Sequence, residues 1–91
     1  MNPYVQTVKP LADYRLELVF ANGERRIFDI APYLSRDVFA RLSNPAIFNS
    51  ARVVAGSVEW QGDLDLSYDT LYVDSHPVQV KFVGAESVRG R

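Results

Sequence analysis

The clearest pattern in this chain is an alternation of apolar and polar side chains that runs into a turn. Between residues 14 and 20, tyrosine, leucine and phenylalanine occupy every second position, and Arg15 and Glu17 lie between them. A period of two is typical of a strand with one buried face. The strand leads into Ala21-Asn22-Gly23, and a second strand is predicted over residues 24–30, so this region indicates a β-hairpin.

The length of the turn decides which residues of this hairpin face each other. A two-residue loop would place Asp29 opposite Leu16, which puts a charge against the apolar stripe. A three-residue loop, with Gly23 in the left-handed conformation, pairs Leu16 with Phe28 instead. It also pairs Arg15 with Asp29 on the solvent side, where opposite charges attract. We therefore predict the three-residue loop.

A further strand is predicted before the hairpin. Residues 5–11 are rich in β-branched side chains. Pro10 has no backbone N–H to donate, which places this strand at the edge of a sheet. The three strands form an antiparallel meander.

In the middle of the chain the apolar side chains no longer alternate but follow a near-helical spacing, and two short helical turns are predicted there. Ser35 is placed to cap the first turn, and Asn44 followed by Pro45 is placed to begin the second. Turns this short do not persist alone, so their apolar side chains should pack on the sheet. The side chains expected to do so are Phe39, Leu42, Ile47 and Phe48.

Strand character returns in the second half of the chain. Residues 51–60 are interrupted by Ala55-Gly56, and a second hairpin is predicted around this pair. Residues 63–72 are acidic and irregularly apolar, which indicates a loop with a single helical turn capped by Ser67. Residues 78–83 alternate again, and this strand can complete the sheet of its own chain or pair with another chain.

These elements predict an α+β fold. The expected architecture is an antiparallel strand meander and hairpins, about five to six strands in all, with two short helical turns packed on the sheet. A chain of 91 residues holds a single hydrophobic core. We therefore expect one domain over residues 1–83 and a flexible C-terminal tail over residues 84–91.

The composition excludes several classes of site. The sequence has no cysteine, so disulfides, zinc–thiolate sites and thiol nucleophiles are excluded. Ten basic and eleven acidic side chains give a net charge of −1, which provides no long-range attraction for a phosphate backbone. Neither a leader peptide nor a membrane-length apolar segment is evident, and we expect a cytoplasmic protein without a membrane contact.

Several short motifs in the first four fifths of the chain resemble one protein family. They are Val19-Phe20, Gly23-Glu24, Phe28-Asp29, Pro32-Tyr33-Leu34, Val58-Glu59-Trp60, Asp63-Leu64-Asp65-Leu66 and Leu71-Tyr72. Over about residues 5 to 73 the chain resembles the small bacterial domain of unknown function family 2442.

The resemblance implies a strand meander with short helices, but it carries no catalytic residue. Some relatives have a helix-turn-helix domain after this one, and some resemble halves of toxin–antitoxin gene pairs. The residues after Val73 are too few for a helix-turn-helix. Operator binding through such a module is therefore not expected.

The acidic segment is similar in spacing to a calcium-binding loop. Its oxygen-bearing side chains at alternate positions are Asp63, Asp65, Ser67 and Asp69, and Asp74 stands at the twelfth position. However, Tyr68 occupies the sixth position, where such a loop needs glycine. We predict no metal site and no cofactor.

The remaining candidates also have structural interpretations. His76, Asp74 and a serine suggest a triad, but no serine lies in a nucleophile elbow, and we predict no enzyme. Trp60 is expected either in the core or as an anchor for a partner. Five arginines could form a nucleic-acid patch, although Arg25 and Arg26 should point to opposite faces of their strand. The five are Arg25, Arg26, Arg36, Arg41 and Arg52.

The favoured function is therefore a noncatalytic protein-interaction or regulatory module that binds a protein partner or forms a homodimer. The sheet edge and the segment from Trp60 to Tyr72 are the candidate binding regions. The expected contact residues are Trp60, Asp63, Asp65, Tyr68 and Tyr72. The alternative is a nucleic-acid-associated regulator of the antitoxin kind, which the overall acidity disfavours.

Overall fold

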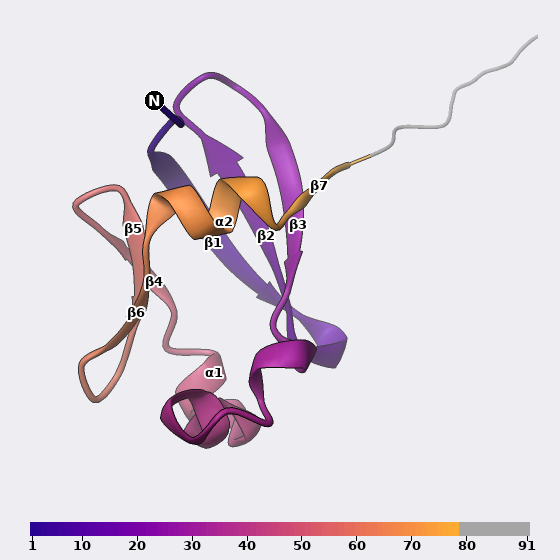
Figure 1. Cartoon of the computed structure of the whole chain (residues 1–91), viewed down its shortest axis with the longest axis vertical. Coiled ribbons are helices and arrows are strands. Elements are labelled where there is room, and N and C mark those ends of the chain that lie inside the picture. Colours follow the sequence, from indigo (N-terminus) through magenta and orange to yellow (C-terminus); the bar gives the residue numbers. More distant parts are fainter. Residues whose placement is uncertain (79–91) are drawn as a thin grey trace, which may run out of the picture.

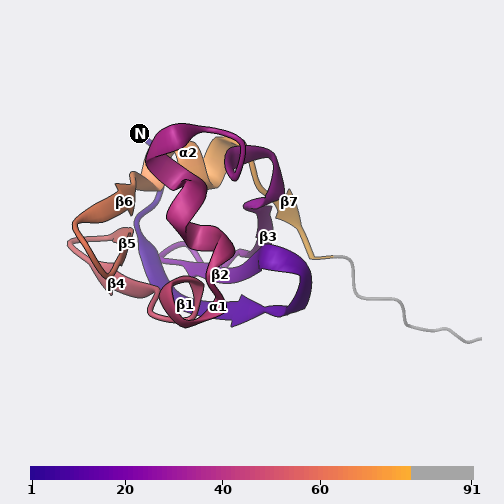
Figure 2. The same ribbon diagram turned by 90° about the horizontal axis from the view of Figure 1, so that it is seen from below.

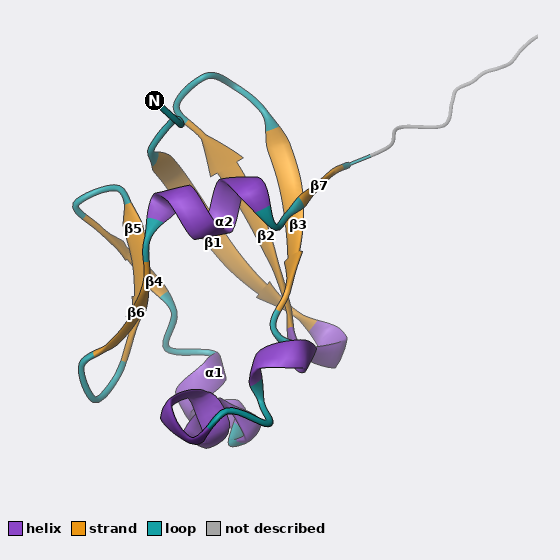
Figure 3. Ribbon diagram, in the orientation of Figure 1, coloured by secondary structure: helices purple, strands orange, loops and turns teal. Residues whose placement is uncertain are grey.

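The protein folds into two antiparallel sheets joined by short helical segments (Figures 1 and 3). The computed structural model describes residues 1–78. The elements are β1 (Val5–Leu11), turn η1 (Ala12–Tyr14), β2 (Arg15–Phe20), β3 (Arg25–Asp29), η2 (Ala31–Tyr33), η3 (Asp37–Ser43), α1 (Pro45–Phe48), β4 (Arg52–Val54), β5 (Ser57–Trp60), β6 (Leu64–Leu66), α2 (Tyr68–Val73) and β7 (His76–Pro77). The α+β class is confirmed, and the seven strands within residues 1–78 exceed the predicted number slightly.

The first sheet has the strand order β1-β2-β3-β7, which confirms the predicted meander with β1 at an edge. Leu16 pairs with Phe28, and Arg15 pairs with Asp29. Phe20 N donates to Glu24 O at 2.9 Å, which encloses a three-residue loop, and Gly23 has a φ of +89°. The predicted register is therefore confirmed.

The inner face of the first sheet forms the largest part of the core. Helix α2 crosses this face in front of β1 and β2 (Figure 1). The core joins both sheets in one cluster of buried side chains: Val5, Leu16, Leu18, Phe20, Phe28, Ile30, Tyr33, Leu42, Phe48, Val58, Trp60, Leu64, Leu66 and Leu71. The opposite face carries the exposed side chains of Arg15, Arg25 and Asp29.

The second sheet, β4-β5-β6, contains the predicted second hairpin. Its tight turn is Ala55-Gly56, and both residues have positive φ, +51° and +81°. Such a turn matches the twist of the flanking strands. Val5 N donates to Gly56 O at 2.8 Å and so connects this turn to the start of β1.

The helical segments close the end of the molecule toward which β1 runs (Figure 2). Asn44 begins α1 as predicted, because its side-chain oxygen accepts a hydrogen bond from Ala46 N at 3.0 Å. The predicted Ser35 cap is wrong: η3 begins after Arg36, and the Ser35 hydroxyl donates to Pro32 O at 3.4 Å instead. Hydrogen bonding within its own turn removes Ser35 from the helix start.

The predicted packing of the helical turns is confirmed. Leu42 and Phe48 are buried in the core, and Phe39 and Ile47 pack against it. The apolar side chains of these short turns are thus held by the sheets rather than by helix propensity.

The prediction of a loop over residues 63–72 is wrong in its first part. Residues Leu64–Leu66 form strand β6, in which Leu66 pairs with Val58 and Leu64 with Trp60. The alternation of Leu64, Asp65 and Leu66 is too short to identify a strand until a partner strand is known. The second part is confirmed, since the Ser67 hydroxyl accepts from Thr70 N at the start of α2.

The start of the C-terminal segment pairs with its own chain. His76 and Pro77 form the short strand β7 and pair with Ile27 and Arg26 of β3. Val78 N donates to Arg25 O at 2.9 Å. The rest of the predicted strand over 78–83, and the predicted tail over 84–91, lie outside the described residues.

Alanine substitutions at two glycines test how closely Tyr4 packs on the Ala55-Gly56 turn. Both glycines have positive φ, so the backbone strain of Gly23→Ala or Gly56→Ala should lower the free energy of unfolding by about 1 to 2 kcal/mol. A Cβ at Gly56 would also lie 2.8 Å from the Tyr4 Cβ, whereas a Cβ at Gly23 would meet nothing within 4 Å. Urea denaturation should therefore show a larger loss for Gly56→Ala. Equal losses would contradict the packing of Tyr4 on this turn.

Candidate functional site

Trp60, expected as a partner anchor or as core, lies in the core. Its side chain is 1% exposed, and the indole Nε1 donates to Phe48 O at 3.1 Å. A buried indole N–H needs such a partner. Trp60 is therefore not available on the folded surface, and its place among the expected contact residues is corrected.

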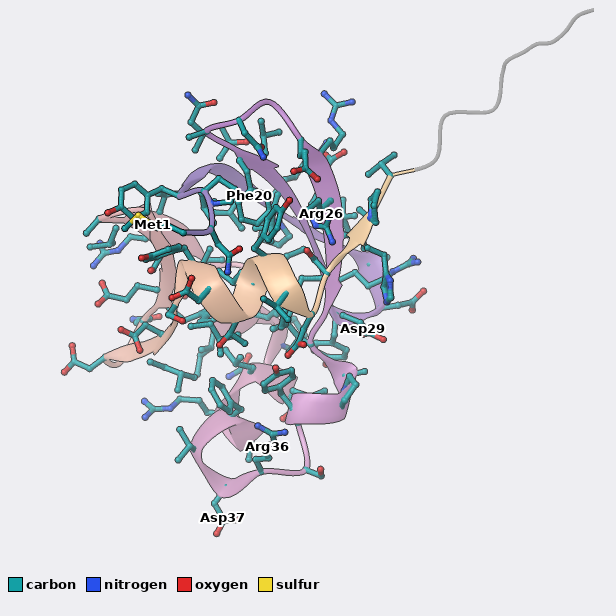
Figure 4. The ribbon with its side chains drawn as sticks, turned by 45° about the horizontal axis from the view of Figure 1, so that its top comes forward. Met1, Phe20, Arg26, Asp29, Arg36 and Asp37 are labelled. Carbon is teal, nitrogen blue, oxygen red and sulfur yellow. The ribbon has the colours of Figure 1, made fainter. Side chains whose placement is uncertain are left out.

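Tyr72 is also used inside the molecule. Its ring lies edge-on to Phe20, with centroids 5.1 Å apart, and the Arg26 guanidinium carbon lies 4.6 Å from its centroid. Figure 4 shows Phe20 and Arg26 next to each other above α2. The Tyr72 hydroxyl donates to the Glu24 carboxylate at 2.5 Å. These contacts connect α2 to the loop between β2 and β3.

Arg26 connects the same region to the segment after α2. Its Nε donates to Ser75 Oγ, and its Nη2 donates to Ser75 O, both at 2.7 Å. Its Nη1 lies 2.9 Å from the Glu24 carboxylate. We call Glu24, Arg26, Tyr72 and Ser75 the Arg26 cluster. It stabilises the pairing of β7 with β3.

The hydrogen bonds of this cluster change the acidity of two members. The hydrogen bond from the Tyr72 hydroxyl, followed by that from Asn22, lowers the pKa of Glu24. The same Tyr72–Glu24 hydrogen bond is the largest cause that raises the pKa of Tyr72, followed by desolvation. Both shifts mean that the pair is most stable with Glu24 ionised and Tyr72 protonated.

A pH titration of stability tests this coupling. A lowered folded pKa means that Glu24 stabilises the fold above its unfolded pKa, and this stabilisation disappears as the pH falls through the folded value. Tyr72→Phe removes the hydrogen bond that is the largest cause of the lowered pKa of Glu24. The stability difference between wild type and Tyr72→Phe should therefore shrink between about pH 5 and pH 3.

The control for this titration is Tyr14→Phe. The Tyr14 hydroxyl donates to Ser43 O at 2.6 Å, and this carbonyl does not titrate. Denaturation by urea at each pH should give a nearly constant difference for Tyr14→Phe. If the Tyr72→Phe difference is equally constant, Glu24 is not coupled to Tyr72.

Asp63 and Asp65 lie on the second sheet, away from Tyr72. Asp63 is in the turn before β6 with a φ of +62°, and the Arg41 guanidinium packs against the neighbouring Gly62. Asp65 is exposed and pairs across the sheet with Glu59. Among residues 1–78, no three acidic or histidine side chains lie close enough together to hold a metal ion.

Tyr68 lies on a surface that includes a residue absent from the predictions. Its ring is edge-on to Tyr4, with centroids 4.6 Å apart, and Tyr4 is 48% exposed. Tyr68 N donates to Ser57 Oγ at 3.0 Å, and Ser57 pairs with Val54, which is 41% exposed. We call Tyr4, Val54 and Tyr68 the Tyr4 surface.

The Tyr4 surface combines three distant parts of the chain. Tyr4 precedes β1, Val54 ends β4, and Tyr68 begins α2. Asn2 Nδ2 donates to Asp69 Oδ1 at 3.0 Å and holds the N-terminal segment on α2. Desolvation, followed by the charge of Asp69, raises the pKa of Tyr68. Tyr4 lies outside every periodic segment of the sequence. The signal that could have identified it is its position between Pro3 and the start of β1.

The arginines do not form one patch. Arg25 lies 3.7 Å from Glu17, and Arg52 lies 2.9 Å from Glu59. The Arg36 guanidinium lies over the Tyr33 ring, 4.5 Å from its centroid. Arg25 is exposed on the outer face and Arg26 is engaged in its cluster, which confirms that these two point to opposite faces.

The side chains suggested for a triad are occupied elsewhere. Ser75 Oγ donates to Tyr72 O at 3.0 Å, and Asp74 Oδ2 accepts from the Tyr33 hydroxyl at 3.2 Å. Burial, followed by the Asp74 charge, raises the pKa of Tyr33. His76 is exposed at the sheet edge. Within the described residues, these groups are not connected as a nucleophile and its base.

Comparison with known proteins gives one match. The family model described as a protein of unknown function, DUF2442, matches residues 5–77. No curated protein and no solved structure matches the chain. Within residues 1–78, no helix is long and apolar enough to span a membrane.

Proposed function

The chain belongs to the DUF2442 family of proteins of unknown function, and we propose that this member is a noncatalytic protein-interaction module that binds its partner through the Tyr4 surface. The observation that carries the proposal is the exposure of Tyr4, 48%, on top of the half-buried Tyr68. Tyrosine is among the residues that contribute most to binding energy at protein interfaces.

The Tyr4 surface is prepared for contact before a partner arrives. The Tyr4 side chain packs directly on Gly56, and Val5 N donates to Gly56 O at 2.8 Å. Both polar groups of the peptide unit between Tyr4 and Val5 are therefore fixed, since Ala21 N also donates to Tyr4 O at 2.8 Å. A surface that is ordered in the free protein loses less conformational entropy on binding.

The charges around this surface indicate the chemistry of the partner. Asp69 lies next to Tyr68, whose pKa is raised by desolvation and then by the Asp69 charge, and Asp69 accepts a hydrogen bond from Asn2 Nδ2 at 3.0 Å. A protein with an apolar contact patch and a basic rim complements this surface, whereas a phosphate backbone is repelled.

The nucleic-acid alternative has less support. It depends on a cluster of arginines, and three of them lie next to glutamates: Arg25, Arg26 and Arg52. Cations that lie apart from one another provide a weak site for phosphates, and the neighbouring glutamates reduce the local positive potential. Salt dependence still distinguishes the two functions.

A pull-down with matched variants tests the proposal. Tyr4→Ser removes the exposed ring, and Val38→Ser changes a side chain that is 63% exposed on η3, far from the Tyr4 surface. We expect the tagged wild type and Val38→Ser to retain the same protein from a lysate, and Tyr4→Ser to retain about tenfold less. The retained amount should be unchanged by nuclease treatment and change little between about 50 and 200 mM salt.

Two results would contradict the proposal. Equal retention by Tyr4→Ser, with its fold confirmed by circular dichroism, would exclude the Tyr4 surface. Loss of all retained material after nuclease treatment would favour the nucleic-acid alternative. Light scattering of the purified chain shows whether the partner is a second copy, in which case Tyr4→Ser should reduce the measured mass to that of the monomer.

A further inference from the structure

A groove lies at the opposite end of β1 from the Tyr4 surface. It has a volume of about 400 Å³ and lies between turn η1 and helix α1. Its apolar walls and floor come from Pro10, Leu11, Tyr14, Pro45 and Phe48. Figure 2 shows α1 next to the end of β1. The volume is within the range of grooves that bind small molecules or single side chains of a peptide.

The walls of the groove are held rigidly. The Tyr14 hydroxyl donates to Ser43 O at 2.6 Å, and its ring is edge-on to Phe48 at 5.3 Å. Ile30 N donates to Tyr14 O at 2.8 Å. Hydrogen bonds at both ends of Tyr14 therefore fix the ring that forms one wall.

The backbone beside the groove is strained. Asp13 and Tyr14 have φ values of +63° and +59°, a conformation that side chains other than glycine rarely adopt. Two such residues in succession persist only where surrounding contacts impose them, and strain of this kind is concentrated at binding sites. Asparagine and aspartate tolerate this conformation best, which fits Asp13 at the rim.

The groove has one charge at its rim. Among the described residues that line it, Asp13 is the charged one, and its side chain is 86% exposed. Its nearest cation is the Arg15 guanidinium at 3.8 Å, which is a weak contact. An apolar ligand with a cationic group therefore complements the groove.

The strand edge next to the groove disfavours one way of binding a peptide. Pro10 has no backbone N–H, and β1 ends at Leu11, so a peptide strand added along the groove would lack a donor at Pro10 and a partner strand beyond Leu11. A polyproline II segment needs no such ladder and docks its side chains in aromatic-lined grooves. We propose that this groove binds a proline-rich segment of a partner protein that carries a lysine or arginine for Asp13.

This inference is independent of the proposed function, because the groove and the Tyr4 surface share no residue. A library of random peptides displayed on phage, selected on the immobilised full chain, provides the probe. We expect enriched peptides to combine prolines with lysine or arginine. Their fluorescein-labelled synthetic copies should bind the purified chain in anisotropy titrations.

Three variants locate the binding. Leu11→Ser removes apolar surface from the groove and should weaken binding by roughly tenfold. Asp13→Asn removes the charge, keeps a residue suited to positive φ, and should weaken binding by about two- to fivefold. Asp37→Asn is the control, since Asp37 is exposed on η3 outside the groove and should bind like wild type (Figure 4).

The proposal is overturned if no peptide is enriched, if the enriched peptides lack prolines and basic residues, or if Leu11→Ser binds as well as wild type. Thermal unfolding of each variant shows whether it is folded. If Leu11→Ser does not fold, the Asp13→Asn result decides alone. Tyr4→Ser should bind these peptides as well as wild type does. The peptide experiment can therefore contradict the groove proposal without affecting the proposed function of the Tyr4 surface.

Discussion

The hydrogen bond from the buried Trp60 indole to Phe48 O is the contact on which much of this small fold depends. It fixes the second sheet, which contains Trp60, against helix α1, which contains Phe48. The Phe48 ring in turn positions Tyr14 at the end of the first sheet. A buried indole without this acceptor would lose its hydrogen bond to water with no replacement, so this contact favours the observed position of the second sheet on α1. Because Gly56 lies in the same hairpin as Trp60, the position of this sheet also decides what Tyr4 packs on.

The Arg26 cluster has the corresponding role at the other side of the first sheet. Strand β7 has two residues and provides few ladder hydrogen bonds of its own. The guanidinium compensates for this by binding both the side chain and the carbonyl of Ser75, and by lying over Tyr72. Charge-assisted hydrogen bonds of this kind are stronger than neutral ones and hold the segment after α2 in place. This use of Tyr72 inside the fold explains why it does not belong to the surface that Tyr68 shares with Tyr4.

The two proposed binding regions lie at the two ends of strand β1. Tyr4 comes just before the strand, whereas Pro10 and Leu11 end it. An extended strand of seven residues separates its ends by about 20 Å, enough for two contacts without overlap. Both regions combine apolar rings with acidic groups, at Asp69 in one and Asp13 in the other. Under the two proposals, one partner would bind at each end of this strand.

The sequence by itself determined the features that depend on neighbouring residues. The register of the first hairpin follows from Gly23 and from the charges on either side of the turn, and the caps at Asn44 and Ser67 need only the next three residues. Only the tertiary structure decided features that need a partner from a distant segment. Strand β6 exists because Leu64 and Leu66 find β5, and β7 exists because β3 has an open edge. The exposure of Trp60, Tyr68 and Tyr72 was likewise open in the sequence, because an aromatic side chain is apolar enough for the core and polar enough for a surface. Long-range packing chose between these places, and local pattern does not contain that information.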